Sequence, residues 1–498
     1  MAASGNRFLY LFVFVIGTAS LGSEIAAARL MAPYFGASTL VWANTIGVVL
    51  LALSLGYWLG GKLADRDPRL QAMCKMVLLA AVLLAIVPFI ARPLFDVSVD
   101  ALDTVSAGSF IGSLFGVLLL VAVPVTLLGA ASPFAIRLSV DRVEDSGSVA
   151  GRLYAISTMG SLLGTWLSAL VLIPFLGTQR TFLVLAAGVA LVAVAGLSLR
   201  WAAIPAALAL ALALPTGTLR AAEDGRVLLE KETEQQFVQV IEEDDGDRLL
   251  ELNEGQAIHS LYKPGSYLTG RYWDGLMVLP FAALDAPPKR VAILGNAAGT
   301  AARMYAHYFP GARVDGVEID PELTEIGEKY FDLGAPNIHT YTADARPWLR
   351  QSDGDYDVIV VDAYRQPYIP FYLATKEFFD LVAEKLAPDG VVVVNVGHPD
   401  GNDDLEQVIG RTMAESFANV TRDPIETENT LMLGSQNEAT PEHLLAELGQ
   451  LPLEVRNIGV AASARIGPRL PGGEVYTDDR APVEWLIDRS ILGYAGDN

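Results

Sequence analysis

Hydrophobic residues are concentrated in the first half of the chain, where they form long runs. The runs cover residues 8–31, 39–61, 70–91, 109–131, 154–176, 181–199 and 201–215. Six of them reach or approach the roughly 20 residues that a helix needs to cross a bilayer. The last run is short and could cross only with tilt, or lie in the interface. The pattern predicts a bundle of about seven membrane helices, which makes residues 1–219 a transmembrane domain.

After residue 220 the pattern changes to short strand-like runs that alternate with amphipathic segments. Residues 226–262 predict a small β unit with strands at 227–232, 237–242 and 248–252, and a hairpin turn at Asp245-Gly246. Further strands are expected at 290–295, 313–319, 338–343, 356–361, 390–396 and 430–433, with helices at 300–308, 375–387 and 404–417 and one beginning at Pro321. Such alternation predicts a mostly parallel, doubly wound sheet. We therefore expect a β subdomain at 220–275 and an α/β domain at 276–498.

Charge follows the same division. Residues 1–219 hold 12 Lys and Arg against 9 Asp and Glu, whereas the remainder holds 23 against 48, and the whole chain carries a net charge of −22. An acidic α/β half argues against nucleic acid, whose phosphates require clustered cations. It is compatible with cationic substrates such as amines, although a merely solvated acidic surface is the simpler interpretation. A single cysteine and five scattered histidines give no metal-ligand pattern, so no metal is expected.

Within the apolar half, Gly56 and Gly60 are four residues apart in the second run, a spacing that favours close packing of helices. Glu24 lies in the first run, where an ionisable side chain must face protein or water. It is interpreted either as part of a structural pair with another helix or as a contact to a substrate or lipid headgroup.

Basic residues predict the orientation of the helices. Lys62, Arg66 and Arg69 fall in one loop, and Arg137, Arg142 and Arg152 fall in another. Two crossings separate these loops, so both are expected on the cytoplasmic face, together with the N-terminus. Seven crossings would then place the α/β half outside, where a cytosolic cofactor is absent. The sequence leaves this conflict, and the choice between seven and eight helices, open.

Small and acidic residues follow successive strands of the α/β half. Gly295 and Gly299 bracket the turn after the first strand, and Glu318, Asp344 and Asp362 end the second, third and fourth. Ligands bind at the carboxyl ends of the strands in such sheets. A lone acid there often caps the next helix, but together these residues predict a nucleoside site. Glu318 is expected at the ribose, Asp344-Ala345 at the adenine edge and Asp362 nearest the reacting centre.

These motifs resemble those of the spermidine synthase family of aminopropyltransferases. The resemblance rests on Gly255-Gln256, Tyr272-Trp273-Asp274, Ile293-Leu294-Gly295, Val317-Glu318-Ile319-Asp320, Asp344-Ala345 and Val360-Val361-Asp362-Ala363. It implies a class I methyltransferase-like (Rossmann-type) fold preceded by a helical membrane bundle, as in bacterial proteins described as membrane-bound spermidine synthases. It also implies that Gln256 contacts the nucleoside, that Asp362 takes the amine proton, and that Tyr272 and Asp274 orient the acceptor.

Two departures from the family pattern concern the substrates. Ala298 stands where the family has an Asp that holds the donor's ammonium. Arg365 stands near the position where the family has a second Asp, which binds the far end of a diamine. Intact S-adenosylmethionine therefore remains an alternative to its decarboxylated form as co-substrate. Arg365 would suit an acceptor with an anionic part, such as a phospholipid headgroup, and a solvated loop residue is the simpler interpretation.

The function expected from the resemblance is a membrane-bound transferase that moves an aminopropyl-type group to an amine or a membrane-associated acceptor and releases methylthioadenosine. The alternatives are a methyltransferase or other chemistry on intact S-adenosylmethionine, and a transporter or sensor whose α/β domain binds nucleoside without turnover. The expected location is a bacterial inner membrane with a cytoplasmic α/β domain, and a homodimer is compatible with the resemblance.

Two further segments carry open interpretations. His259-Ser260-Leu261-Tyr262 either lines the acceptor side or forms a turn at a sheet edge. Residues 477–484, with Thr477 and Asp478 at their start, are dense in polar groups and are either a helix cap or a lid over the site.

Overall fold

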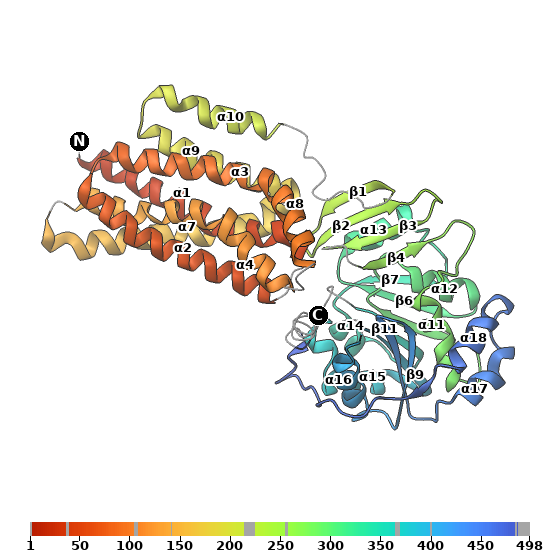
Figure 1. Cartoon of the computed structure of the whole chain (residues 1–498). Coiled ribbons are helices and arrows are strands. Elements are labelled where there is room, and N and C mark those ends of the chain that lie inside the picture. The colour runs from red at the N-terminus through yellow and green to blue at the C-terminus, as the bar shows by residue number, and fades with distance from the viewer. Residues whose placement is uncertain are drawn as a thin grey trace. The chain divides into compact units, whose positions relative to one another are not determined.

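The computed structural model of the chain describes residues 2–35, 39–103, 108–140, 142–213, 225–253, 257–363, 369–398, 401–483 and 486. The chain divides into two compact units (Figure 1). The helical unit comprises Met1–Ala221 with Glu230–Phe237, and the α/β unit comprises Ala222–Leu229 with Val238–Asn498.

The helices of the first unit are α1 (Ala2–Phe35), α2 (Thr39–Arg66), α3 (Leu70–Asp103), α4 (Gly108–Leu120), α5 (Ala122–Gly129), α6 (Ala131–Ser139), α7 (Ser146–Leu167), α8 (Ile173–Leu176), α9 (Thr178–Ala195) and α10 (Ala203–Ala211). A π-helical segment, Ser168–Leu172, joins α7 to α8. In the described part of the chain, six stretches are long and apolar enough to cross a membrane, and Leu199–Ala211 is a shorter apolar helix. The expectation of about seven apolar helices thus becomes six long ones and a short one.

The fourth hydrophobic run is the place where the helix bounds differ from expectation. Instead of one helix over 109–131, the structure has α4, α5 and α6, with breaks at Val121 and Ala130. Each break lies three residues before a proline, Pro124 or Pro133. A proline ring clashes with the carbonyl four residues earlier, which interrupts a helix at that point. The long apolar stretch here is consequently Ala122–Ser139.

Close helix packing at small residues is confirmed. A Cβ added at Gly56 would lie 2.3 Å from the carbonyl oxygen of Thr126, and one added at Gly60 would lie 2.5 Å from Cα of Ala130. Helix α2 therefore contacts α5 and the start of α6 backbone to backbone, as small residues permit.

The two basic loops also lie at one end of this bundle. Nε of Arg137, in the last turn of α6, is 3.5 Å from Oδ1 of Asp65 at the end of α2. No ion pair of Glu24 is found in the described residues, so the structural pair considered for it is not seen there.

The α/β unit begins with a four-stranded antiparallel sheet in the order β1-β2-β3-β4. Its strands are β1 (Arg226–Glu232), β2 (Phe237–Glu242), β3 (Arg248–Leu252) and β4 (Ile258–Tyr262). Gly246 supplies the positive φ of +89° that the turn between β2 and β3 requires. The first three strands match the sequence expectation, and β4 is added by the structure.

The larger sheet has eight strands in the order β12-β10-β11-β9-β8-β5-β6-β7. They are β5 (Arg290–Leu294), β6 (Arg313–Glu318), β7 (Ile338–Thr342), β8 (Tyr356–Val361), β9 (Leu386–Gly397), β10 (Asn419–Glu426), β11 (Asn429–Ser435) and β12 (Gly467–Pro468). Strands β5 to β9 pair in parallel, while β11 and β10 add antiparallel strands beyond β9. The mostly parallel sheet is thus confirmed, with an antiparallel extension that the sequence pattern did not indicate.

Helices cover both faces of this sheet (Figure 1). They are α11 (Tyr272–Val278), α12 (Thr300–Tyr308), α13 (Pro321–Tyr330), α14 (Ala345–Gln351), α15 (Lys376–Lys385), α16 (Asp404–Met413), α17 (Pro441–Ala446) and α18 (Arg456–Ser463). Alternate residues of a strand face opposite sides. Accordingly, Val358 and Val360 join one apolar cluster and Ile359 and Val361 join the other.

Candidate active site

The turn after β5 brings the first and fourth strands together at the carboxyl edge of the sheet. Gly295 has a φ of +90°, and a Cβ there would lie 2.5 Å from both the Asp362 carbonyl oxygen and Cα of Ala363. Only glycine fits this contact without displacing the backbone after β8. Gly299 has a φ of +92°, and its missing Cβ makes room for the side chain of Leu333. Both predicted loop glycines therefore have a steric reason to be glycine.

Glu318 ends β6 and is buried beside this turn. One carboxylate oxygen accepts from the Ala297 backbone N–H at 2.9 Å and the other from that of Asp320 at 3.0 Å. Desolvation raises the pKa of Glu318 to about 7, although these backbone bonds oppose the shift. The carboxylate can still accept further hydrogen bonds, since each oxygen has a second lone pair.

Ala298, in contrast, is part of the apolar core. Its side chain is fully buried in an apolar cluster with residues of β2, β3 and α13, and its N–H donates to Oγ of Ser260 at 3.0 Å. Ala297 is partly exposed and takes a left-handed φ of +45°. An acidic side chain at position 297 would therefore be more accessible than one at position 298, and neither position carries an acid.

The catalytic candidate Asp362 follows β8 and accepts several hydrogen bonds. The Tyr272 hydroxyl donates to Oδ2 at 3.0 Å, Nδ2 of Asn395 donates to Oδ1 at 2.9 Å, and the Trp273 side chain donates as well. Desolvation raises the pKa of Asp362 to about 6, against the lowering effect of these three donors. At pH 7 the carboxyl group is therefore mostly ionised and able to take a proton.

Tyr272 is itself held firmly. Its ring stacks on Trp273 with centroids 4.4 Å apart, and its backbone N–H donates to Oε1 of Glu426 at 2.7 Å. Glu426 ends β10, so the antiparallel extension of the sheet positions α11. Tyr272, expected to orient the acceptor, thus lies beside Asp362, and two contacts that the sequence pattern did not indicate hold it there.

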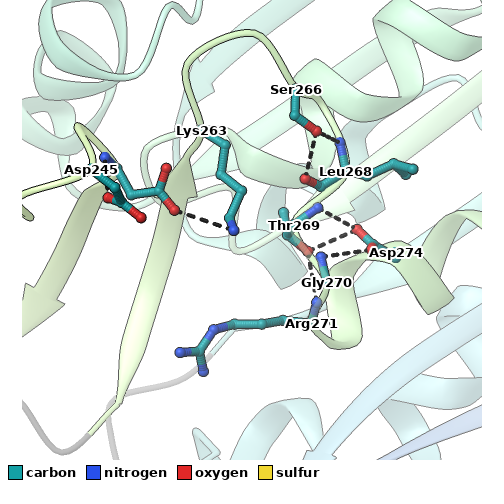
Figure 2. A network of polar contacts seen from close by, with 9 residues as sticks. Asp245, Lys263, Ser266, Leu268, Thr269, Gly270, Arg271 and Asp274 are labelled. Atoms are coloured by element: carbon teal, nitrogen blue, oxygen red, sulfur yellow. Dashed lines mark hydrogen bonds and ion pairs between the residues drawn. The ribbon is translucent and has the colours of Figure 1, made fainter.

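Asp274, the other predicted acceptor residue, faces the preceding loop (Figure 2). It is 5% exposed, and its carboxylate accepts from the N–H and hydroxyl of Thr269 and from the N–H of Gly270, at 2.7–2.8 Å. No hydrogen bond in the described residues joins it to Asp362. We interpret Asp274 as the residue that shapes the loop before α11.

Asp344 is placed at the end of β7, where it caps α14. One oxygen accepts from the Arg346 N–H at 3.0 Å and the other from the Tyr372 hydroxyl at 2.8 Å. Arg346 forms a two-pronged pair with Asp478 at 2.7 Å, and Thr375 also donates to Asp478. The polar C-terminal segment is thus a turn fixed against α14, while Ala345 lies in the first turn of that helix.

Of the remaining residues singled out in the sequence, the structure describes His259 and Ser260. The segment containing His259 and Ser260 is strand β4, and it contacts the glycine turn through Ser260. Burial lowers the pKa of His259 to about 4, which leaves its ring neutral. Gln256 and Arg365 lie outside the described residues.

Sequence reasoning missed three amides of this region. Asn296 in the glycine turn is 4% exposed, and within the described chain neither polar atom of its side chain has a hydrogen-bond partner. Asn395 and Asn429 stand behind Asp362. A signal existed for Asn395, which interrupts the apolar run from Val391 to Val396 at a buried position.

Groups with metal-ligand character lie elsewhere. Within the described residues, two sets of side chains bring three oxygen or nitrogen atoms together. They are Asp285, His443 and Glu447, and Glu243, Asp245 and Asp247. Lys263 pairs with Asp247 at 3.2 Å in the second set. Neither set contains a predicted site residue.

The strand order and the acids at successive strand ends define an α/β domain of the class I methyltransferase type. Residues 273–427 match the family described as "Spermine/spermidine synthase domain". This part of the α/β unit is therefore similar to a spermine/spermidine synthase domain, and a region of apolar helices precedes it.

Curated relatives are similar to the chain over this region. The chain is 34% identical over 272 residues to a "Probable polyamine aminopropyl transferase" of Bifidobacterium longum, and the match covers 50% of this chain and 60% of that protein. It is 26% identical over 428 residues to "Polyamine aminopropyltransferase 2" of Ralstonia nicotianae, with 79% of each chain covered. The second alignment is longer than the α/β unit, so part of the helical unit takes part in it.

Among solved structures, a probable spermidine synthase from Corynebacterium glutamicum is similar at 23% identity with a TM-score of 0.39, over 51% of this chain and 98% of that one. Spermidine synthase from Thermotoga maritima gives 20% identity and a TM-score of 0.39, over 48% and 84%. The chain thus spans three fifths of the length of the first curated relative. The matches to that relative and to the Corynebacterium structure each cover about half of this chain.

Proposed function

We propose that this protein is a membrane-bound transferase that moves an aminopropyl group from decarboxylated S-adenosylmethionine to an amine. The attacking nitrogen forms a bond to the propyl carbon next to the sulfonium. The carbon–sulfur bond breaks, its electrons stay on sulfur, and methylthioadenosine leaves. The ammonium formed then loses a proton to Asp362. These steps require an in-line pose and a carboxylate near the developing cation.

One observation carries the proposal most directly. The Tyr272–Asp362 pair lies at the end of β8, and Gly295 of the nucleoside turn contacts the backbone after that strand. This proximity of Asp362 to the glycine turn supports a base beside a nucleoside, and Glu318 beside the turn has oxygens that could accept from the ribose hydroxyls. The aminopropyltransferase names of the relatives support the same reaction class.

The first alternative is chemistry on intact S-adenosylmethionine, including methyl transfer. It is favoured by Ala297 and Ala298, because neither places a carboxylate where it would repel the donor's own carboxylate. The second alternative is nucleoside binding without turnover in a transporter or sensor, which the apolar helices keep open.

The test is product analysis with the full-length protein in lipid nanodiscs. Decarboxylated and intact S-adenosylmethionine are supplied separately, each with a diamine, a triamine or a lipid extract, and the released nucleoside is identified by mass spectrometry. Methylthioadenosine from the decarboxylated donor supports the proposal, whereas S-adenosylhomocysteine from the intact donor supports methyl transfer. If Asp362→Asn retains full turnover, the base assignment is wrong. If wild type releases neither nucleoside, the binding-only alternative prevails.

We further propose that the α/β domain lies on the cytoplasmic side. The contact between Arg137 and Asp65 supports placing both basic loops on one face. Six crossings return the chain to the side of its N-terminus, which removes the conflict that seven created. A C-terminal fluorescent or alkaline phosphatase fusion tests this: fluorescence with no phosphatase activity supports it, and the reverse overturns it.

A further inference from the structure

Two side-chain amides form a connected line behind Asp362. Nδ2 of Asn395 donates to Oδ1 of Asp362 at 2.9 Å, and Nδ2 of Asn429 donates to Oδ1 of Asn395 at 2.9 Å. Asn395 lies on β9 and Asn429 is the first residue of β11. The two strands pair antiparallel with Asn395 opposite Leu431 and Asn429 opposite Gly397. The amides are therefore diagonal neighbours on one face of the sheet.

That face is otherwise apolar. Val391, Val393 and Leu431 all belong to the same buried cluster, and Asn395 continues their side of β9 with an exposure of only 3%. Burying an amide among such residues is costly unless its polar atoms are bonded. A valine would satisfy the core at this position, so the amide requires a reason outside packing.

The reason follows from what each group can donate and accept. An ionised carboxylate only accepts hydrogen bonds, while an amide has a donating and an accepting end. Asn395 must turn its NH₂ toward Asp362, which leaves its oxygen buried and in need of a donor. The Asn429 NH₂ is that donor. If the Asn395 amide were reversed, its NH₂ would face the NH₂ of Asn429, which is also a donor. Its oxygen would face the carboxylate of Asp362, which is also an acceptor.

We propose that Asn429 is a positioning residue for the reaction: by fixing the amide of Asn395, it keeps Asp362 ionised and aimed at the attacking amine. This inference rests on the proposed function. Among the described residues no hydrogen bond joins Asn429 to Asp362 directly, and its effect on Asp362 passes through Asn395.

Other titratable side chains around Asp362 are already engaged. Tyr272 on α11 donates to Asp362, Glu426 on β10 accepts from the Tyr272 backbone, and His398 after β9 shares a hydrogen bond with the Thr430 hydroxyl. The pKa of Asp362 therefore depends on its desolvation and on donors whose orientation the amides help to set.

Two substitutions of Asn429 distinguish an effect on the orientation of the Asn395 amide from the mere loss of a hydrogen bond. Asn429→Ala removes the donor and lets Asn395 turn. Asn429→Asp replaces the donor with an acceptor, so Asn395 should direct its NH₂ to the new carboxylate and its oxygen to Asp362. The second change should raise the pKa of Asp362 more than the first, although Asp is closer to Asn in size. Asn437→Ala is the matched control, because the Asn437 amide also bonds a side chain, Asp389, but at an exposed position.

The experiment measures kcat/KM against pH from 5 to 9 for the full-length protein in nanodiscs, with the donor that wild type uses. For Asn429→Ala we expect the pH at which activity falls on the acid side to move up by about one unit. The loss of kcat/KM should then be about twofold at pH 7 and about tenfold at pH 5. Asn429→Asp should move this acid limb further, and Asn437→Ala should leave it in place. The donor KM should not change. An acid limb that stays at the wild-type pH in both Asn429 variants overturns the proposal, as does an equal loss at every pH.

Failure of the proposed function is distinguishable from failure of this inference. If wild type shows no turnover, protonation of Asp362 can still be followed by the infrared C=O stretch of its carboxylic acid form, with Asp362→Asn subtracted as a reference. The midpoint should rise in the order wild type, Asn429→Ala, Asn429→Asp. Equal midpoints in all three would show that Asn429 does not act on Asp362.

Discussion

The hydroxyl of Tyr272 lies 3.0 Å from Oδ2 of Asp362, although 90 residues separate them in the chain. The contact joins the start of α11 to the end of β8, and it exists because Glu426 and Trp273 hold Tyr272 in place. A phenol that donates to a carboxylate favours its ionised form.

Tyr272→Phe should consequently lower activity by weakening both the position and the ionisation of Asp362. We expect kcat to fall about 10- to 100-fold, as for loss of a hydrogen bond to a charged group. The wild-type rate should drop as the pH falls through about 6, where Asp362 gains its proton. In Tyr272→Phe this drop should occur at higher pH. A pH–rate profile measures both effects, and an unmoved acid limb would contradict the role assigned to the hydroxyl.

Glu318 should make donor binding depend on pH. Its pKa is raised to about 7 by burial, and only the ionised form can accept from both ribose hydroxyls. The affinity for methylthioadenosine should therefore weaken as the pH falls from 8 to 6. Glu318→Gln should bind about 10- to 100-fold more weakly at pH 8 and lose this dependence. Calorimetry across the pH range measures it, and Glu322→Gln on the neighbouring helix α13 serves as the comparison. A wild-type affinity that is flat from pH 6 to 8 would count against a ribose role.

Gly295→Ala should damage the α/β unit through its backbone. Alanine at a φ of +90° is strained, and its Cβ would lie 2.5 Å from the backbone of Asp362 and Ala363. We expect a loss of about 1–3 kcal/mol in the free energy of unfolding, together with weaker nucleoside binding. Gly311→Ala is the control, since a Cβ there meets nothing within 4 Å. Denaturation followed by circular dichroism compares the two, and equal stability would show that the turn can relax.

Asp274→Asn should affect stability before chemistry. One oxygen of Asp274 accepts two hydrogen bonds from Thr269 and the other accepts one from Gly270, so an amide nitrogen would face a donor. We expect destabilisation by about 1–3 kcal/mol, measured by thermal melting, and a modest rise in acceptor KM through displacement of α11. The exposed Asp353→Asn should change neither. A large fall in kcat without a change in melting temperature would instead favour the direct acceptor role first expected for Asp274.

The sequence by itself determined the division into an apolar helical half and an acidic α/β half. It also determined the succession of strands β5 to β9 along the chain and the residues that end most of them. Hydrophobic periodicity is a local property, and acids that follow strands must meet at one edge of a parallel sheet. That is why Gly295, Glu318 and Asp362 could be predicted together.

The tertiary structure decided which partners these residues have. Asn395 reaches Asp362, and Asn429 reaches Asn395, only because β9 pairs with β8 on one side and with the antiparallel β11 on the other. The hydrophobic pattern along the chain does not indicate which strands pair with β9. Asp274 shares a predicted motif with Tyr272, yet the turn of α11 sends the two side chains to different neighbours. The physical reason is that burial and hydrogen bonding depend on contacts across the sheet, which a pattern read along the chain does not contain.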